Sequence, residues 1–211
     1  MQIRIIPFLF LSFVLFTSAV SAQDSHMLFG GGLNLSKFSR KGPSGVHFYD
    51  QNFLTGFNAL IGYQTSGDEV GVTVIGIGFE TRGTELKDET PSGNAFEEKT
   101  RLDYLHFAFA FKYFITESAV KPYASPGLDI AFLTNAEIED EDGVRDFPQT
   151  STLDLDLGLA LGAEIPFGRH AVFLEGGYAY GLFNALEGDI AKDFTFHNSC
   201  IKLRGGFLLG I

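Results

Sequence analysis

The sequence is poor in cysteine, tryptophan and basic residues. Among 211 residues there are one Cys and no Trp, and 15 Lys and Arg stand against 26 Asp and Glu, which gives a formal net charge of -11. A single cysteine cannot form an intrachain disulfide or a metal site of several cysteines. The acidic balance excludes the basic surface that nucleic-acid phosphates require, so we expect no nucleic-acid partner.

Long apolar runs are also lacking after residue 22, where no stretch approaches the length that indicates a membrane-spanning helix. The N-terminus differs from the rest of the chain. Arg4 precedes an apolar run over 5–16, and small residues follow up to Ala22. This run is short for a membrane anchor and is typical of an export signal. We expect residues 1–22 to be a cleaved signal peptide and residues 23–211 to form one exported domain.

The chain is rich in glycine and phenylalanine, and its apolar residues alternate with small or charged ones. In 153–167 the odd positions are apolar, and the even positions are mostly Asp, Gly, Ala and Glu. The segments 105–113 and 201–211 repeat the pattern. Period two indicates β-strands, and these runs are about twice the usual strand length. Because the less apolar face is mostly Gly and Ala, the pattern favours a narrow barrel with its apolar face in lipid.

Eight segments have this character, and a sheet exposed to lipid must close on itself. The sequence therefore predicts an all-β fold, an eight-stranded antiparallel transmembrane β-barrel. Four long connections alternate with three short turns, which in such barrels are extracellular and periplasmic respectively. The predicted strands are 26–36, 53–64, 69–83, 101–115, 121–134, 152–166, 170–184 and 196–211. The long connections are 37–52, 84–100, 135–151 and 185–195.

One predicted strand changes its alternation. Apolar residues occupy even positions up to Val74 and odd positions from Ile75 onward. One extra residue in the strand would restore a single apolar face. We therefore expect a β-bulge at Val74–Ile75.

Strand parity also assigns charged residues to the lumen, where each must be paired or hydrated. Glu175 lies at a similar height to Lys202 and Arg204 on the neighbouring strand. We therefore predict an ion pair from Glu175 to Arg204 or to Lys202, within a polar network that is structural. The predicted lumen set is Glu80, Arg82, His106, Lys112, Asp129, Asp154, Asp156, Glu164, Glu175, Lys202 and Arg204.

Several short segments resemble the PorT-like outer-membrane β-barrel family of the Bacteroidota. They are 79–83 (FETRG), 102–106 (LDYLH), 121–127 (KPYASPG), 156–164 (DLGLALGAE) and 175–182 (EGGYAYGL). The resemblance covers the whole exported domain. It implies an eight-stranded barrel in the outer membrane of a Gram-negative cell, and it implies little about a specific activity.

Two residues on the last predicted strand resemble a catalytic pair. His197 and Ser199 share a strand face, as do the Ser and His of outer-membrane lipid A 3-O-deacylases. Those enzymes have Asn after the Ser and an acidic partner on a following strand, whereas Cys200 follows Ser199 here. A lipid A hydrolase therefore stays as an alternative, and we expect no enzyme.

The predicted connections differ in charge. Lys37, Arg40 and Lys41 in the first long connection suit the phosphates of lipopolysaccharide. The acidic residues of 137–146 lack the spacing of a calcium loop. We expect no metal site and no cofactor.

The patterns together predict a non-enzymatic outer-membrane barrel with a lumen filled by side chains. It would act through its surface loops or in envelope organisation. Its expected partners are outer-membrane lipid, lipopolysaccharide and an unidentified extracellular or envelope protein. A small channel is the other alternative, although eight strands leave an interior that side chains just fill.

Overall fold

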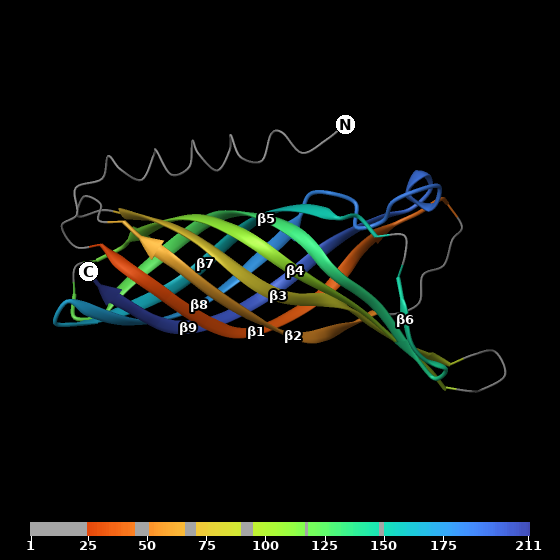
Figure 1. Cartoon of the computed structure of the whole chain (residues 1–211), viewed down its shortest axis with the longest axis horizontal. Helices are drawn as coiled ribbons and strands as arrows, with labels where there is room; N and C mark the ends of the chain where they lie inside the picture. The colour runs from red at the N-terminus through yellow and green to blue at the C-terminus, as the bar shows by residue number, and fades with distance from the viewer. Residues whose placement is uncertain (1–24, 45–50, 66–70, 90–94, 117, 148–149) are drawn as a thin grey trace.

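A computed structural model describes residues 25–44, 51–65, 71–89, 95–116, 118–147 and 150–211. Almost all of the regular structure is β-strand (Figure 1). The elements are β1 (His26–Lys41), β2 (Gln51–Gln64), β3 (Gly71–Glu89), β4 (Ala95–Phe114), β5 (Lys121–Asp140), β6 (Gly143–Asp146), β7 (Leu153–Phe167), β8 (His170–Gly181), the 3₁₀ helix η1 (Ile190–Lys192) and β9 (Thr195–Gly210). The predicted signal peptide, 1–22, lies outside the described residues.

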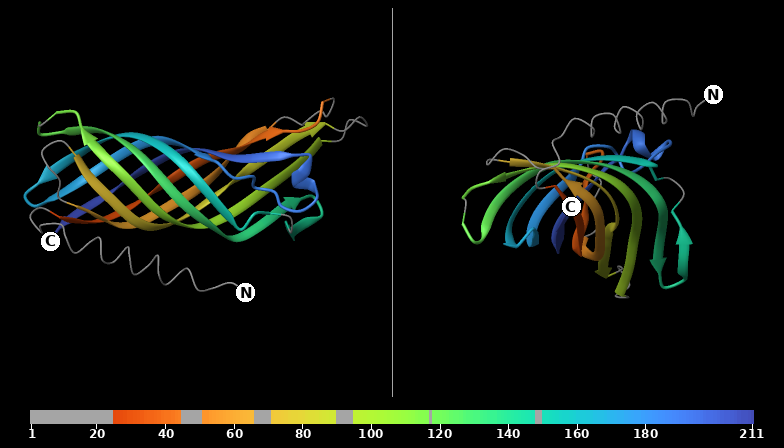
Figure 2. Two further views of the ribbon diagram at one scale, coloured as in Figure 1. Left: turned by 90° about the horizontal axis from the view of Figure 1, so that it is seen from above. Right: turned by 60° about the vertical axis from the view of Figure 1, so that its left-hand side comes forward.

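The strands form one antiparallel sheet that closes into a ring of eight. Strands that follow each other in the chain pair with each other, except β6 and β7. β5 pairs with β7, and β9 pairs with β1 along its whole length. The short strand β6 pairs with β5 and lies outside the ring. Figures 1 and 2 show the strands inclined to the long axis of the barrel. The predicted eight-stranded antiparallel barrel is confirmed.

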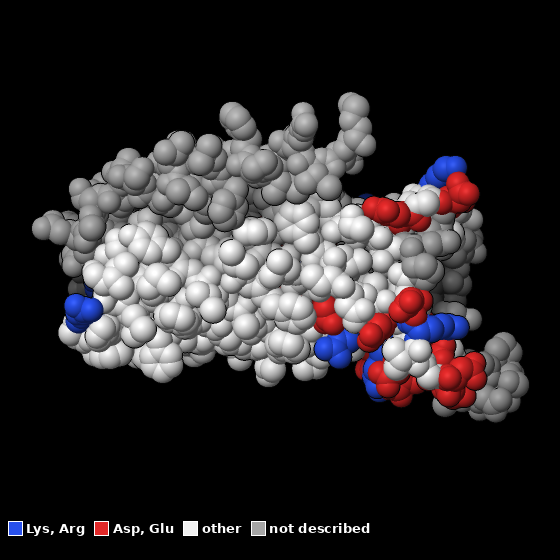
Figure 3. Space-filling model, viewed as in Figure 1, with Lys and Arg blue, Asp and Glu red and all other residues white. Residues whose placement is uncertain are grey.

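The alternation in the sequence corresponds to the two faces of the barrel wall. On β7, Leu157 and Leu161 point outward with 52% and 62% of their surface exposed, whereas Asp154 and Asp156 point inward with 2% and 1% exposed. On the face seen in Figure 3, the part of the wall that is not covered by grey atoms is accordingly almost free of charged residues between the two ends of the barrel. An apolar surface of this extent is stable in lipid and not in water. Among the described residues, no helix is long and apolar enough to cross a membrane.

The two ends of the barrel differ. At one end, here called the terminal end, the backbone N–H of Ile211 donates to the carbonyl of Ser25, so both ends of the described chain meet there. β2, β4 and β7 end here, and β3, β5 and β8 begin here (Figure 1). The opposite end, here called the loop end, carries the other connections. There β3, β4 and β5 extend past the rest of the barrel together with β6.

Three predicted connections at the loop end are shorter than expected because the strands continue into them. β1 reaches Lys41, β3 reaches Glu89 opposite Ala95 on β4, and β5 reaches Asp140. Apolar alternation marks only the part of a strand that faces lipid on one side. Beyond the lipid both faces meet water, so the strand persists while its pattern disappears.

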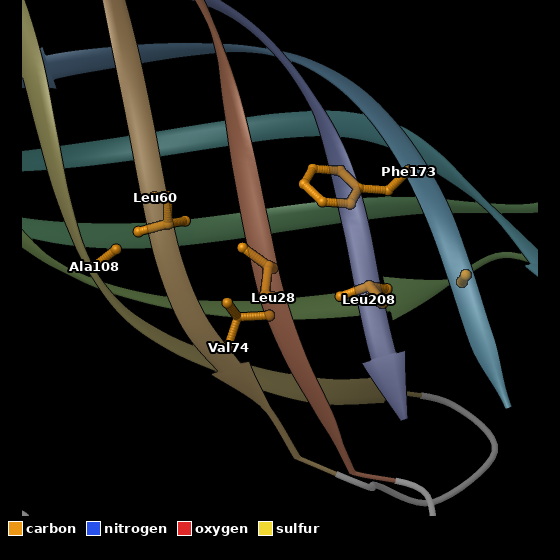
Figure 4. Packing of buried hydrophobic residues seen from close by; sticks show 7 residues of the cluster. Leu28, Leu60, Val74, Ala108, Phe173 and Leu208 are labelled. Carbon is orange, nitrogen blue, oxygen red and sulfur yellow. The ribbon is translucent and has the colours of Figure 1, made fainter. Parts of the chain in front are cut away.

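The expected bulge at Val74–Ile75 is wrong. Pairing of β3 with both β2 and β4 is continuous there, and Val74 is buried in the lumen. Figure 4 shows Val74 in an apolar cluster with side chains from β1, β2, β8 and β9. Both faces of β3 are therefore apolar near the terminal end. In the sequence, this gives the same pattern as a change of register. This cluster, the terminal apolar cluster, comprises Leu28, Leu60, Val74, Ala108, Ala171, Phe173 and Leu208.

The β1–β9 pairing that closes the barrel leaves no room for a side chain at Gly32. A Cβ there would lie 1.8 Å from the carbonyl oxygen of Leu203, whereas a Cβ at the adjacent Gly31 would lie 3.4 Å from its nearest atom, the carbonyl oxygen of Asn58. We expect Gly32→Ala to lower the free energy of unfolding by about 1–3 kcal/mol, because the backbone must move. Gly31→Ala is the matched control and should be close to wild type. Urea unfolding in detergent micelles measures both, and equal losses would contradict the prediction.

Candidate functional site

The lumen holds all the charged residues that strand parity assigned to it. Asp129 and Arg204 are half-buried, and the others are buried. Small residues on neighbouring strands make room for them. A Cβ at Gly78, for example, would lie 2.3 Å from Nε2 of His106. The inward residues form two groups, each defined by its ion pairs.

The first group, the Arg204 cluster, lies toward the terminal end and consists of Arg204, Glu175, Lys112, Glu164 and Tyr123. Nη2 of Arg204 lies 2.8 Å from Oε1 of Glu175, so the ion pair predicted for these two residues is present. The Tyr123 hydroxyl donates to the other oxygen of Glu175 at 2.8 Å. Nζ of Lys112 lies 2.6 Å from Glu164. Two cations and two carboxylates make this cluster electrically balanced.

The second group, the Arg82 cluster, lies closer to the loop end. Its members are Arg82, Glu80, Asp154, Asp156, Lys202, Asp129 and His106. The Arg82 guanidinium contacts Glu80 and donates to Asp156 at 2.8 Å. It also lies 3.7 Å from Asp154. Arg82 on β3 is thereby joined across the lumen to β7.

Lys202 belongs to the Arg82 cluster and not to Glu175, which was the alternative partner predicted for it. Its Nζ lies 2.7 Å from Glu80 and 3.2 Å from Asp129. Lys202 is one inward position nearer the loop end than Arg204, so its ammonium reaches the carboxylates of β3 and β5. Sequence parity gave the correct face, and the structure selects the partner.

Sequence reasoning missed the neutral residues of the lumen. The Asn198 amide donates to Asp154 at 2.8 Å, and the Asn58 amide donates to Asn34 at 2.7 Å. The ring of Tyr104 lies beneath the Arg82 guanidinium at 5.1 Å. All of them occupy inward positions, so the same parity rule would have found them had it been applied to amides and phenols.

Apolar clusters share the lumen with the charged clusters, and Nζ of Lys112 lies 5.1 Å above the ring of Phe173. On β9, Leu208 of the terminal apolar cluster lies nearer the terminal end than Arg204 and Lys202. Phe38 on β1 belongs to a second apolar cluster, at the loop end. A cavity of about 80 Å³ lies beside Lys202, Arg204 and Asp129. At roughly 10–15 Å³ per water, it has room for about five to eight waters. The second cluster, the loop-end apolar cluster, comprises Phe38, Leu102, Tyr104, Ala131 and Ala185.

The basic residues predicted for lipopolysaccharide contact lie on β1 and not in a loop, so their expected placement is wrong. Lys37 and Lys41 point outward, and Nζ of Lys37 lies 4.7 Å above the ring of Phe53. Arg40 is on the opposite face, over the ring of Phe196 at 5.9 Å. The structure therefore brings two of the three residues to the outer surface.

A groove of about 770 Å³ lies on the outer surface, at the base of the extended strands. Its apolar wall includes Phe53 and Phe57 on β2, and its charged wall includes Lys99 and Arg101 on β4. Glu137 on β5 is among its acidic residues. The groove thus joins the upper edge of the apolar band to the charged loop end.

His197 and Ser199 share the outward face of β9, as expected. The imidazole of His197 stacks on the ring of Tyr180 with centroids 5.4 Å apart. Within the described residues, no hydrogen bond joins Ser199 to His197 and no carboxylate contacts His197. The pair therefore lacks the contacts through which a histidine activates a serine.

The contacts of Glu175 predict which substitutions are coupled. Arg204→Gln should cost about 3–5 kcal/mol of unfolding free energy, because it leaves the buried charge of Glu175 without its ion-pair partner, and Glu175→Gln should cost somewhat less because Arg204 is half-buried. The double variant should lose much less than the sum. Lys202→Gln is the control, since Lys202 contacts other carboxylates, and its loss should add to that of Glu175→Gln. Urea unfolding in lipid vesicles measures the cycle, and additive losses for Glu175 with Arg204 would refute the pairing.

Several solved structures are similar to this chain at low sequence identity. Neisserial surface protein A of Neisseria has a TM-score of 0.50 and 12% identity, covering 90% of this chain and 99% of that chain. OprG of Pseudomonas aeruginosa has a TM-score of 0.46 and 11% identity, with 87% and 94% covered. Ail of Yersinia pestis, in complex with the heparin analogue sucrose octasulfate, has a TM-score of 0.44 and 15% identity, with 89% and 100% covered. A comparison with curated proteins gave no match.

A family model provides the classification. The outer membrane protein beta-barrel domain matches residues 21–187, which include β1 to β8 of the barrel. The remaining strand, β9, closes the ring by pairing with β8 and β1. The chain belongs to the outer membrane protein beta-barrel domain family and is an outer-membrane protein.

Proposed function

We propose that this protein is a non-enzymatic outer-membrane barrel with a closed lumen, which acts through the surface at its loop end or in envelope organisation. The observation that carries the proposal is the filling of the lumen. Two ion-paired clusters and two apolar clusters fill it together, and the cavity among them has room for only about five to eight waters. A closed lumen leaves the outer surface for interactions with an extracellular or envelope protein.

We place the loop end outside the cell, because long connections of outer-membrane barrels are extracellular. The charged side chains of the visible face gather at this end, around the extended strands (Figure 3). Nζ of Lys99 lies 3.0 Å from Glu97, and hydrogen bonding to Lys99 lowers the pKa of this carboxyl. Arg145 on β6 lies 2.7 Å from Asp140. These paired charges suit a hydrated surface above the membrane.

We also propose that the rim of the loop end contacts lipopolysaccharide. Lys37 and Lys41 point outward at the upper edge of the apolar band, and Lys37 lies over the ring of Phe53. The adjacent groove offers aromatic rings next to Lys99 and Arg101. Cationic side chains bind phosphate, and apolar side chains at the same height pack against acyl chains. Lipid A presents both groups together.

We further propose that the protein is a PorT-like barrel and that a signal peptide directs its export. The segments 79–83, 102–106 and 121–127 support a place among the PorT-like barrels of the Bacteroidota. The basic residue, apolar run and small residues of 1–22 support a signal peptide that is removed on export.

A closed lumen predicts that the reconstituted protein does not conduct. We expect no conductance steps in planar bilayers and no sugar-driven swelling of liposomes, because the cavity does not accommodate a hydrated solute. Protein-free bilayers and a wide porin are the negative and positive controls. Stable conductance steps would contradict the proposal and favour the channel alternative.

The proposed lipid contact predicts a loss of bound lipopolysaccharide. Lys37→Gln with Lys41→Gln should weaken binding about tenfold, the low end of the contribution of a charge-assisted hydrogen bond. Lys192→Gln is the matched control, because Lys192 is exposed at the same end and pairs with Asp189. Binding is measured by titrating the micellar protein with fluorescent lipopolysaccharide. Equal affinity in the double variant and the control would refute the proposed contact.

A further inference from the structure

The two charged clusters of the lumen differ in their electrical balance. The Arg204 cluster contains two cations and two carboxylates. The Arg82 cluster contains four carboxylates and two cationic side chains, so its formal charge is -2 with His106 neutral. Excess charge in a lumen surrounded by lipid is costly unless it is neutralised. The Arg82 cluster therefore calls for additional positive charge.

His106 is the second unusual feature of this cluster. Its side chain is 2% exposed, and neither ring nitrogen has a hydrogen-bond partner among the described residues. Its Nδ1 lies 3.8 Å from a carboxylate oxygen of Asp129, which is longer than a hydrogen bond. A buried polar group without a partner costs about 1–3 kcal/mol and calls for an explanation. An imidazole nitrogen next to carboxylates is a common metal ligand.

We propose that Glu80, His106 and Asp129 bind a divalent cation of the Zn²⁺ type inside the barrel. One donor atom from each residue lies within 4.8 Å of the other two. Ligand atoms around a tetrahedral Zn²⁺ ion, each about 2.0–2.1 Å from the metal, lie roughly 3.3 Å apart. Small side-chain rotations therefore bring the donors into range and leave a fourth position for water. The ion supplies the two positive charges that the Arg82 cluster lacks.

The donor set selects the kind of metal. Ca²⁺ and Mg²⁺ take oxygen ligands, and Mg²⁺ keeps several of its waters. One imidazole with two carboxylates suits Zn²⁺ and its first-row neighbours instead. The single Cys200 is not one of the three donors.

Lys202 is the built-in competitor for this site. Its ammonium lies between Glu80 and Asp129, at 2.7 and 3.2 Å. Lys202 also lines the cavity of about 80 Å³, so its flexible side chain has room to withdraw when a metal takes these carboxylates. Removing the Lys202 charge should therefore strengthen metal binding, although it removes two ion pairs. If Lys202 had only a structural role, removing its charge would not increase the affinity for the metal.

The test measures metal binding by the full exported domain, refolded in detergent micelles without a polyhistidine tag. Zn²⁺ is titrated by calorimetry, and Co²⁺ is followed by visible absorption, which reports nitrogen ligation. We expect a single binding site in the wild-type protein. His106→Asn and Asp129→Asn should each weaken it more than about tenfold, since even residues behind the ligands contribute that much. Lys202→Met should bind more tightly than wild type.

His197→Asn is the matched control, because His197 lies on the outer face of β9 and should not alter the affinity. The mobility of unheated samples on denaturing gels checks that each variant folds. Asp129 is half-buried and His106 is more deeply buried. If His106→Asn does not fold, Asp129→Asn still tests the site. Absence of binding by the wild-type protein would overturn the proposal. Affinity that survives His106→Asn and Asp129→Asn would also overturn it and place the metal elsewhere.

Discussion

Lipid surrounds the barrel wall, and so each inward charge must find its compensation inside a narrow lumen. This constraint explains the long-range contacts of the structure. Arg82 on β3 reaches Asp156 on β7, and Lys202 on β9 reaches Asp129 on β5. Neither pair of strands is adjacent in the sheet. The charged side chains thus hold opposite sides of the wall together, whereas the backbone hydrogen bonds join only neighbours.

The fold was predictable from the sequence because the membrane imposes a simple rule on each strand. One face meets lipid and the other meets the lumen. The residue types of Leu157 and Asp156 on β7 are therefore enough to predict that Leu157 points outward and Asp156 inward. The rule fails where its physical cause is absent. Val74 faces the lumen within the terminal apolar cluster, and its apolar side chain was therefore misread as a change of register. Above the membrane both faces are wet, and the continuation of β3 to Glu89 was missed.

The charged residues of the candidate site were predictable for the same reason, but their contacts were only partly so. Glu175 and Arg204 are direct partners across adjacent strands, and a count along β8 and β9 limited the partner of Glu175 to Arg204 or Lys202. The partners of Lys202 lie across the lumen on β3 and β5. Contacts of that kind depend on strand tilt and on the size of neighbouring residues such as Gly78. The size of each residue is known from the sequence, but neither the strand tilt nor which small residues lie beside a given charge can be obtained from one sequence.

Closing the lumen does not by itself require ions. The terminal apolar cluster fills its part of the barrel with Leu28, Phe173 and Leu208, and buried ion pairs often add no stability over apolar residues of similar volume. The Arg82 cluster must therefore contribute something that apolar packing does not. Ion pairs have specific partners, so they fix the relative heights of strands that share no backbone hydrogen bonds, which apolar side chains do only weakly. The balanced Arg204 cluster needs nothing more than this structural role, whereas the negative charge around His106 exceeds what that role requires.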